Sequence, residues 1–313
     1  MAALAGEAQA PGPEWKRALD QLNATGWAAT PSPTPSPTGG TLWNPQAATV
    51  QRLEKKRKAF LKALDKTGPS LTDLQARFEE LNRRSAIMNR TDPLTEAEKK
   101  EWRAIMDEKL IEKKRAADRA LFLKHFGNKT PTKPPLPAVT YNNATFQQNY
   151  QEAQTFLSRL MPDLPVGESE SVVRPNVTIR PDVRCGFRDS EDRIFLDVYT
   201  AHGAVHEYGH FLEKWGATEN GVSYGALAND YLEGRTKGQK MVSMRAATNE
   251  SWFNASEMTR PDHFLEPYTG KFYASGATEI TSTGLGHLFN DPGNFARKDP
   301  DHFLFTLHLL QGG

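Results

Sequence analysis

The stretch AHGAVHEYGHFLEKWG, residues 201–216, limits what this chain can fold into more than any other feature of its sequence. His206 and His210 are four residues apart, so on an α-helix they share one face, with Cβ atoms on the order of 5–6 Å apart. An apolar stripe with helical spacing lies on another face and consists of Val205, Tyr208, Leu212 and Trp215. The pattern predicts a helix that packs one side against a core and presents two imidazoles on another.

Residues 206–210, HEYGH, match the H-E-x-x-H pattern of zinc metallopeptidases. Two neutral imidazoles on neighbouring turns can bind one zinc ion through bonds of about 2.1 Å. Zinc lowers the pKa of its water to about 7, and a glutamate beside it can take up the proton. The motif predicts His206 and His210 as zinc ligands and Glu207 as general base. His202 is expected outside the ligand set, because one straight helix does not easily aim three imidazoles at one tetrahedral ion.

A catalytic zinc ion needs a third protein ligand, and several later carboxylates are candidates. Glu233 and Glu266 adjoin turn signals and are expected to be exposed, whereas Glu250 lacks a clear apolar helical face. Asp230 falls roughly where a ligand at short spacing would lie, and it stays open as an alternative. We favour Glu279, because it directly precedes ITSTGLGHLF, whose small residues permit close packing against the histidine helix and whose apolar residues supply a buried side.

Other polar residues near these motifs have less specific signals. Tyr268 and Tyr273, in PYTGKFY, could each place a phenol near the metal and stabilise a developing oxyanion, although packing is the commoner fate of such tyrosines. Tyr224 is a weaker candidate for the same role. The later histidines are expected to pack or to face solvent; they are His287, His302 and His308.

Several blocks after the histidine motif occur in an order that is similar to a known group of domains. The blocks are VHEYGHFLE, LEGRTKGQK, RPDHFLEPYTGKFY, ATEITSTGLGHLF and DPGNFARKDPDHFLFTLHLLQG. Over residues 180–312 they resemble zincin-type domains attached to phage head-morphogenesis and other mobile-element proteins. The resemblance implies a gluzincin-like site with His206, His210 and Glu279 as ligands and Glu207 as catalyst. It suits a free enzyme, a phage-particle component, or an effector delivered by a secretion or injection machinery.

Composition and periodicity divide the chain into parts. Alternating prolines in ATPSPTPSPTGG favour an extended, solvated segment, and GNKTPTKPPLPAVT marks a second boundary. Between these stretches the period is helical and breaks twice, which predicts three helices, the last of which continues from Thr95 to Phe126. The expected parts are a disordered or loosely attached segment (1–43), a basic helical domain (44–127), a Pro-rich linker (128–140) and a metallopeptidase domain (141–313).

The expected fold is α+β and mostly helical, with a zincin-like domain after the helical one. A helix is predicted after Asn143, with a buried side that includes Phe146 and Tyr150. Three β-like runs precede the histidine helix; they are NVTI (176–179), RCGFR (184–188) and RIFLDV (193–198). The turn residues DSED between the last two predict a hairpin, and the three runs are expected to form a small antiparallel sheet.

Charge and cysteine content narrow the classes of function. Residues 51–126 hold 20 Lys and Arg against 13 Asp and Glu, but acidic residues interleave with the basic ones, which favours a solvated helix face over nucleic-acid binding. Cys185 is the only cysteine, so no intramolecular disulfide is possible, and an ordinary strand residue is the simplest interpretation. Neither a signal peptide nor a membrane-spanning run is recognisable, so a cytoplasmic, virion or injected location is expected, with no membrane partner.

The leading hypothesis is therefore a zinc-dependent endopeptidase that acts on a protein or peptide substrate. A first alternative is a phage-derived structural or head-associated module whose zinc merely stabilises the fold, but such a site would not need the general base Glu207. A second alternative is a nucleic-acid-binding helical protein, for which binding by residues 46–126 should weaken steeply as salt rises.

Overall fold

The computed structural model describes residues 47–85, 93–107, 109–128, 135–161, 174–180, 185–197, 201–218 and 220–311. These residues are mostly helical with a small sheet, which confirms an α+β-like class. The segment 1–43, expected to be loosely attached, lies outside them. None of the described helices has the length and apolar character that a membrane crossing requires.

The chain order of the elements is as follows. The helices are α2 (Ala47–Leu64), α3 (Leu71–Ser85), α4 (Glu96–Asp107), α5 (Leu110–Phe126), α6 (Ala144–Leu160), α7 (Ala201–Trp215), α8 (Tyr224–Arg235), α9 (Met244–Thr248), α10 (Ile280–Asn290), α11 (Pro292–Lys298) and α12 (Pro300–Leu310). The strands are β1 (Asn176–Ile179), β2 (Gly186–Arg188), β3 (Arg193–Leu196), β4 (Val242–Ser243) and β5 (Met258–Thr259). Two short 3-10 helices are η1 (Asp189–Glu191) and η2 (Pro267–Gly270).

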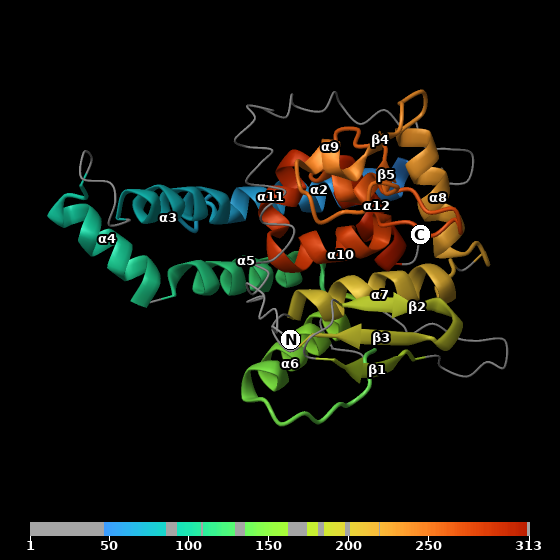
Figure 1. Ribbon diagram of the computed structural model, residues 1–313, viewed down its shortest axis with the longest axis horizontal. Coiled ribbons are helices and arrows are strands. Elements are labelled where there is room, and N and C mark those ends of the chain that lie inside the picture. The colour runs from blue at the N-terminus through green and yellow to red at the C-terminus, as the bar shows by residue number, and fades with distance from the viewer. Residues whose placement is uncertain are drawn as a thin grey trace, which may run out of the picture.

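Helix α10 lies at the centre of the body, between α7 on one side and α11 and α12 on the other (Figure 1). Its residues are buried all round except for the half-buried His287, because other elements pack against several of its sides. Helix α7 separates α10 from the sheet, and the predicted stripe of Val205, Tyr208 and Leu212 is buried in the main core. The histidine helix is thus enclosed between two layers.

The hydrophobic core crosses the boundary expected between residues 127 and 141. Phe122 and Phe126 of α5 contact Phe303 of α12, with ring centroids 6.2 Å and 5.6 Å apart. Phe122 also stacks against Phe156 of α6, at 6.3 Å. The apolar faces of α2 and α5 therefore complete the same core as the histidine helix, and Leu136 of the expected linker is buried in it as well.

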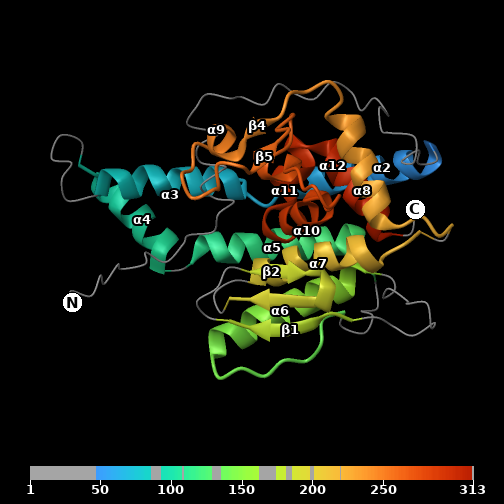
Figure 2. The ribbon, with the colours of Figure 1, turned by 45° about the vertical axis from the view of Figure 1, so that its right-hand side comes forward.

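Helices α3 and α4 extend from this body as an arm (Figures 1 and 2). A small separate cluster of Leu81, Leu94 and Ile105 stabilises the arm. The prediction of one helix from Thr95 to Phe126 is wrong, because the chain bends at Lys109, which has φ 51°. The expected three-helix domain therefore contains four helices within the described residues. Helix α4 belongs to the arm, whereas α5 returns to the body.

The charges of the arm are largely arranged in ion pairs. The pairs are Arg77–Glu101 at 2.8 Å, Arg83–Glu80 at 2.8 Å, Arg84–Glu98 at 2.6 Å and Lys99–Glu96 at 2.6 Å. Surface pairs of this kind contribute little stability, but they neutralise basic side chains that a nucleic acid would otherwise contact. The basic runs EKKRK of α2 and EKKRAADR of α5 lie outside the arm, so the nucleic-acid alternative stays a prediction.

The sheet contains the predicted hairpin but is not wholly antiparallel. Strands β2 and β3 pair antiparallel, with Phe187 opposite Ile194, whereas β1 pairs parallel with β3. The order is β1-β3-β2, so β3 is central. Ile194, Phe195 and Leu196 are all buried, and a strand this apolar is most stable between two neighbours. The expectation of a small antiparallel sheet is therefore corrected to a mixed one.

Candidate metal centre

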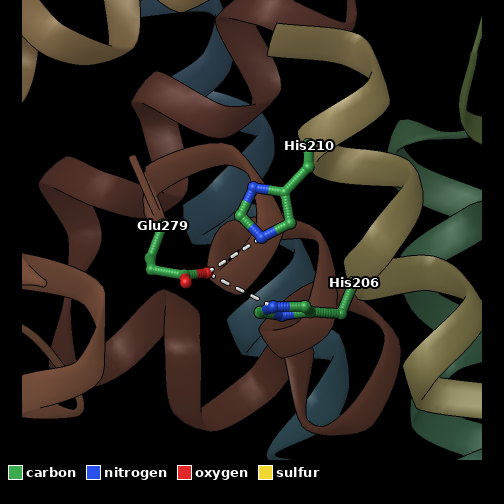
Figure 3. Close-up of side chains that lie close together, drawn as sticks. All are labelled: His206, His210 and Glu279. Atoms are coloured by element: carbon green, nitrogen blue, oxygen red, sulfur yellow. Dashed lines mark ion pairs between the residues drawn. The ribbon is translucent and has the colours of Figure 1, made fainter. Parts of the chain in front are cut away.

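Two helices bring together the three side chains that the sequence put forward as ligands. His206 and His210 project from adjacent turns of α7, and Glu279 lies at the N-terminal end of α10 (Figure 3). The Oε2 atom of Glu279 is 3.3 Å from Nε2 of His206 and 3.2 Å from Nε2 of His210. Among the described residues, these three form the one group of His, Cys, Asp or Glu side chains arranged to hold a metal ion.

The spacing of these atoms fits a tetrahedral zinc site. Ligand atoms about 2.1 Å from a zinc ion at tetrahedral angles are about 3.4 Å from each other. The two distances from Glu279 Oε2 to the imidazole nitrogens lie close to that value. Two nitrogens and one carboxylate oxygen are also the donor set of a catalytic zinc site with one remaining position. The residues therefore fit the metal that the motif implies.

Close approach of α7 and α10 makes this arrangement possible. A Cβ atom on Gly209 would lie 2.4 Å from Cα of Ser282, so the two backbones meet where a side chain cannot be placed. Glycine in a helix interior costs about 1 kcal/mol relative to alanine, and close packing is a usual compensation. Gly284, expected to face α7, instead faces Thr306 of α12, whereas Gly286 makes room for the ring of His202.

Replacing Gly209 with alanine is expected to destabilise the fold by about 1–3 kcal/mol, because the added methyl must push α10 away from α7. Gly186 is a matched control, since a Cβ there would meet nothing within 4 Å. Urea denaturation of both variants measures the difference. Equal unfolding free energies for Gly209→Ala and wild type would show that the helices do not approach as described.

Hydrogen bonds fix the carboxylate of Glu279, which is 1 % exposed. The hydroxyl of Tyr273 donates to Oε1 at 2.5 Å, and the hydroxyl of Ser282 donates to Oε2 at 2.7 Å. The side chains of His206 and His210 keep 14 % and 17 % of their surface exposed. The centre thus combines a rigid, buried oxygen ligand with two imidazoles that solvent can reach.

The metal-free centre is strongly polarised. Burial disfavours the His210 cation, but the neighbouring Glu279 carboxylate outweighs this and raises the pKa of His210 to about 10. Burial would likewise raise the pKa of Glu279, but attraction to His210 and hydrogen bonds from both histidines hold it well below its ordinary value. Without metal, the two residues therefore form an ion pair at neutral pH, with the Glu279 carboxylate buried and the His210 imidazole partly exposed.

These shifts predict how the stability of the metal-free protein depends on pH. The contribution of His210 is fully present below its ordinary pKa of 6.5 and is lost as the pH rises toward about 10. The contribution of Glu279 is present above its ordinary 4.5 and is lost as the pH falls through its lowered pKa. The unfolding free energy should therefore fall from pH 6.5 to pH 10.

Urea denaturation across this pH range measures the effect, and Glu279→Gln is the control. The variant should lose most of the slope, because its neutral amide cannot stabilise the His210 cation. An unchanged slope in the variant would contradict the ion pair. With zinc present, the unfolding free energy of wild type should instead rise with pH, because protons compete with the metal for the ligands.

Glu207 lies beside the two histidines and is 5 % exposed. Burial raises the pKa of the Cys185 thiol, and the nearby carboxylates of Asp197 and Glu207 raise it further. The sulfur of Cys185 accepts a hydrogen bond from the backbone N–H of Asp197 at 3.3 Å. Cys185 is therefore held as a thiol near Glu207, in agreement with an ordinary structural role.

His202 lies one turn before His206 and outside the three-residue group. Burial, together with the charges of His206 and Arg115, lowers the pKa of His202 to about 3, so its ring is neutral. The ring packs against Gly286 of α10. The expectation that His202 is not a ligand agrees with this placement.

The other candidate carboxylates lie elsewhere. Asp230 is half-buried on α8 and does not join the group, and Glu233 is exposed and pairs with Arg260 at 2.5 Å. Glu250 is buried and accepts a hydrogen bond from the indole of Trp252. Glu266 was expected to be exposed, but it is 7 % exposed, because η2 folds its segment over α10.

Both candidate tyrosines lie near the centre. The ring centroid of Tyr268 is 6.2 Å from that of His206, and the hydroxyl of Tyr273 contacts Glu279. The ammonium group of Lys271 lies 5.1 Å from the ring of Tyr268 and 4.7 Å from the ring of Tyr273. Tyr224 instead packs against Gly216, beyond the end of α7. The weaker tyrosine candidate is thus in a packing role.

The later histidines have packing roles or lie away from the centre. Burial and His302 lower the pKa of His287 to about 3, and burial lowers that of His302 to about 4. The imidazole of His302 contacts the carbonyl of Ile280 at 2.8 Å, and His308 is half-buried on α12. None of these three belongs to the group of described residues that could hold a metal ion.

Sequence reasoning missed two residues that support the site, Glu213 and Lys271. Glu213 shares the stripe of the three histidines and follows His210 by three residues, but nothing in the sequence shows what it faces. Lys271 lies between two candidate tyrosines in PYTGKFY, where its charge signals solvent exposure; in the structure it is 7 % exposed.

Comparison with other proteins leaves the site to be interpreted from its own geometry. No protein-family model, no curated protein and no solved structure matches the chain.

Proposed function

We propose that the chain is a zinc-dependent endopeptidase of the zincin type, with His206, His210 and Glu279 as metal ligands. The observation that carries the proposal is the position of Glu279 Oε2, which is 3.3 Å and 3.2 Å from the two imidazole nitrogens. The resemblance of residues 180–312 to zincin-type domains supports the same assignment.

Glu207 acts as general base in this proposal. A bound zinc ion would polarise the scissile carbonyl and acidify the attacking water. The carboxylate of Glu207 lies near enough to His210 to help raise the pKa of that imidazole, and in the H-E-x-x-H pattern the glutamate takes the proton of the attacking water and passes it to the leaving amine. Its burial, at 5 % exposure, supports this role, because an enclosed carboxylate is shielded from bulk water.

Two tyrosines complete the proposed machinery. Tyr268 lies beside His206 and is suited to donate a hydrogen bond to the oxyanion that develops at the scissile carbonyl. Tyr273 already donates to Glu279 and is suited to hold that ligand in place until substrate arrives. The ammonium group of Lys271 pairs with Glu257 at 2.7 Å and also lies over both rings, which supports a cation–π contact with each tyrosine.

An extended peptide is the substrate form that the surroundings favour. Among the described residues strand β2 is an edge of the sheet, and a further strand could be added at its outer side. It also contacts α7, the helix that carries the two histidines. A substrate backbone paired with β2 would therefore run past the exposed sides of His206 and His210, which supports internal cleavage of a chain.

A purely structural metal site is the weaker alternative. A metal that only stabilises the fold needs no carboxylate such as Glu207 beside it and no exposed ligands. Whether the enzyme is free, part of a phage particle or delivered as an effector stays a prediction from the sequence resemblance, as does its location.

Reconstitution tests the proposed function. Purified protein is stripped of metal, reloaded with zinc and incubated with a mixture of unfolded proteins, and new N-termini are identified by mass spectrometry. Cleavage should require zinc and should stop when a chelator is added. Cleavage that persists equally without metal, or no cleavage by zinc-loaded protein, would contradict the proposal.

A further inference from the structure

The first turn of α10 is capped by a residue from another helix. Glu279 occupies the N-cap position, yet its own side chain makes no capping hydrogen bond. Glu213 of α7 takes that place: its Oε1 accepts from the backbone N–H of Thr281 at 3.0 Å and from the hydroxyl of Thr278 at 2.7 Å. Its Oε2 accepts from the backbone N–H of Thr278 at 3.3 Å.

This cap leaves the carboxylate of Glu279 free to face the metal centre. The first backbone N–H groups of a helix have no partner within the helix, and an N-cap side chain normally accepts from one of them. If Glu279 capped its own helix, its carboxylate would turn toward the backbone of α10. Because Glu213 satisfies Thr281, Glu279 can point toward His206 and His210 instead.

The position of Glu213 also links α7, which carries the two histidines, to the start of α10, which carries Glu279. Glu213 follows His210 by three residues, and so lies one turn further along the helix that carries both histidines. The carboxylate is 9 % exposed, and desolvation of an anion is unfavourable unless hydrogen bonds offset it. Its three hydrogen bonds, together with the positive end of the α10 dipole, offset part of that cost.

We infer that Glu213 is a positioning residue that holds the third metal ligand, Glu279, in register with the two histidines. The inference rests on the proposed zinc site. Glu213 does not contact substrate or metal; it acts by satisfying the first turn of α10. Residues that orient ligands in this way typically contribute 10–100-fold to metal affinity.

The test compares zinc affinity in four variants, measured by competition with a chromophoric chelator. Glu213→Ala should bind zinc about 10–100-fold more weakly than wild type. Glu213→Gln should lose much less, because its amide oxygen can still accept from Thr281. Thr278→Val removes the hydroxyl that donates to Glu213 and that also accepts from the backbone N–H of Ile280, and it should give a loss between the two. Glu233→Gln, on the exposed side of α8, should bind as wild type does.

Hydrogen exchange on metal-free protein gives a second readout. Amides of residues 278–284 should exchange faster in Glu213→Ala than in wild type, whether or not zinc binds. If wild type bound no zinc, the proposed function would fail, and this exchange measurement would still decide whether Glu213 holds α10. Unchanged exchange in Glu213→Ala overturns the inference.

A merely structural role predicts a different pattern. Thermal stability would fall in Glu213→Ala, but the folded variant would bind zinc within about twofold of wild type. That result would also overturn the inference. If Glu213→Ala does not fold, Thr278→Val carries the test. Zinc affinity and hydrogen exchange that both equal those of wild type in Thr278→Val would overturn the inference.

Discussion

Replacement of Glu207 with glutamine is expected to lower kcat about 10²–10⁴-fold while zinc content and Tm stay at wild-type values. Glutamine has nearly the same shape, which matters because Glu207 is 5 % exposed in a packed helix interface. Its amide cannot accept a proton from water at neutral pH, so the step that Glu207 is proposed to perform is lost. The variant therefore separates catalysis from metal binding and folding.

Steady-state cleavage of a peptide found in the reconstitution experiment measures this effect. Glu233→Gln serves as the matched control, because it removes an equal charge from an exposed position away from the centre. Wild-type turnover in Glu207→Gln would remove the enzyme hypothesis and favour a metal that only stabilises the fold. Loss of zinc in the same variant would instead make Glu207 part of the metal-binding group.

Replacement of Glu279 with alanine is expected to weaken zinc binding more than about 100-fold, because even residues that only orient ligands contribute 10–100-fold. The change removes the Oε2 atom, which lies 3.3 Å and 3.2 Å from the Nε2 atoms of His206 and His210. It also removes the carboxylate oxygen that accepts a hydrogen bond from the Tyr273 hydroxyl. Peptidase activity should disappear with the metal.

Glu266→Ala is the matched control for this experiment. Glu266 is buried nearly as deeply as Glu279 and lies 3.5 Å from a histidine, His287, but outside the metal-binding group. It should lose stability and keep wild-type zinc affinity at temperatures where it is folded. Equal zinc affinities of Glu279→Ala and wild type would contradict the assignment of the third ligand.

Local patterns in the sequence predicted most helix starts and faces correctly. The side chain of Asn143 caps α6 by accepting from the backbone N–H of Phe146, and the predicted apolar side of that helix is buried. These features succeed because hydrogen bonds over three or four residues and the helical period depend on neighbours in sequence.

Features that depend on distant contacts were predicted less well. The bend at Lys109 was missed, because nothing in the sequence indicates that a lysine adopts a left-handed backbone conformation. The bend is needed only because α4 packs in the arm and α5 packs in the body. The parallel pairing of β1 was missed because alternation sets which side of a strand is buried but not which neighbour it takes. Burial of Glu266 likewise depends on how η2 folds over α10.

The candidate site shows the same division. Spacing within one helix was enough to select His206 and His210, and small residues after Glu279 indicated a close helix contact, as Gly209 and Ser282 now make. The role proposed for Glu213 could not be predicted, because its partners at Thr278 and Thr281 lie more than sixty residues away.

X-ray absorption and anomalous diffraction at the zinc edge, on crystals of zinc-loaded protein, test the central claim most directly. The account predicts one zinc ion per chain, bound by Nε2 of His206, Nε2 of His210 and a carboxylate oxygen of Glu279 at about 2.0–2.2 Å. A crystal without zinc at this place, or with the ion held by other side chains while these three point apart, would contradict it.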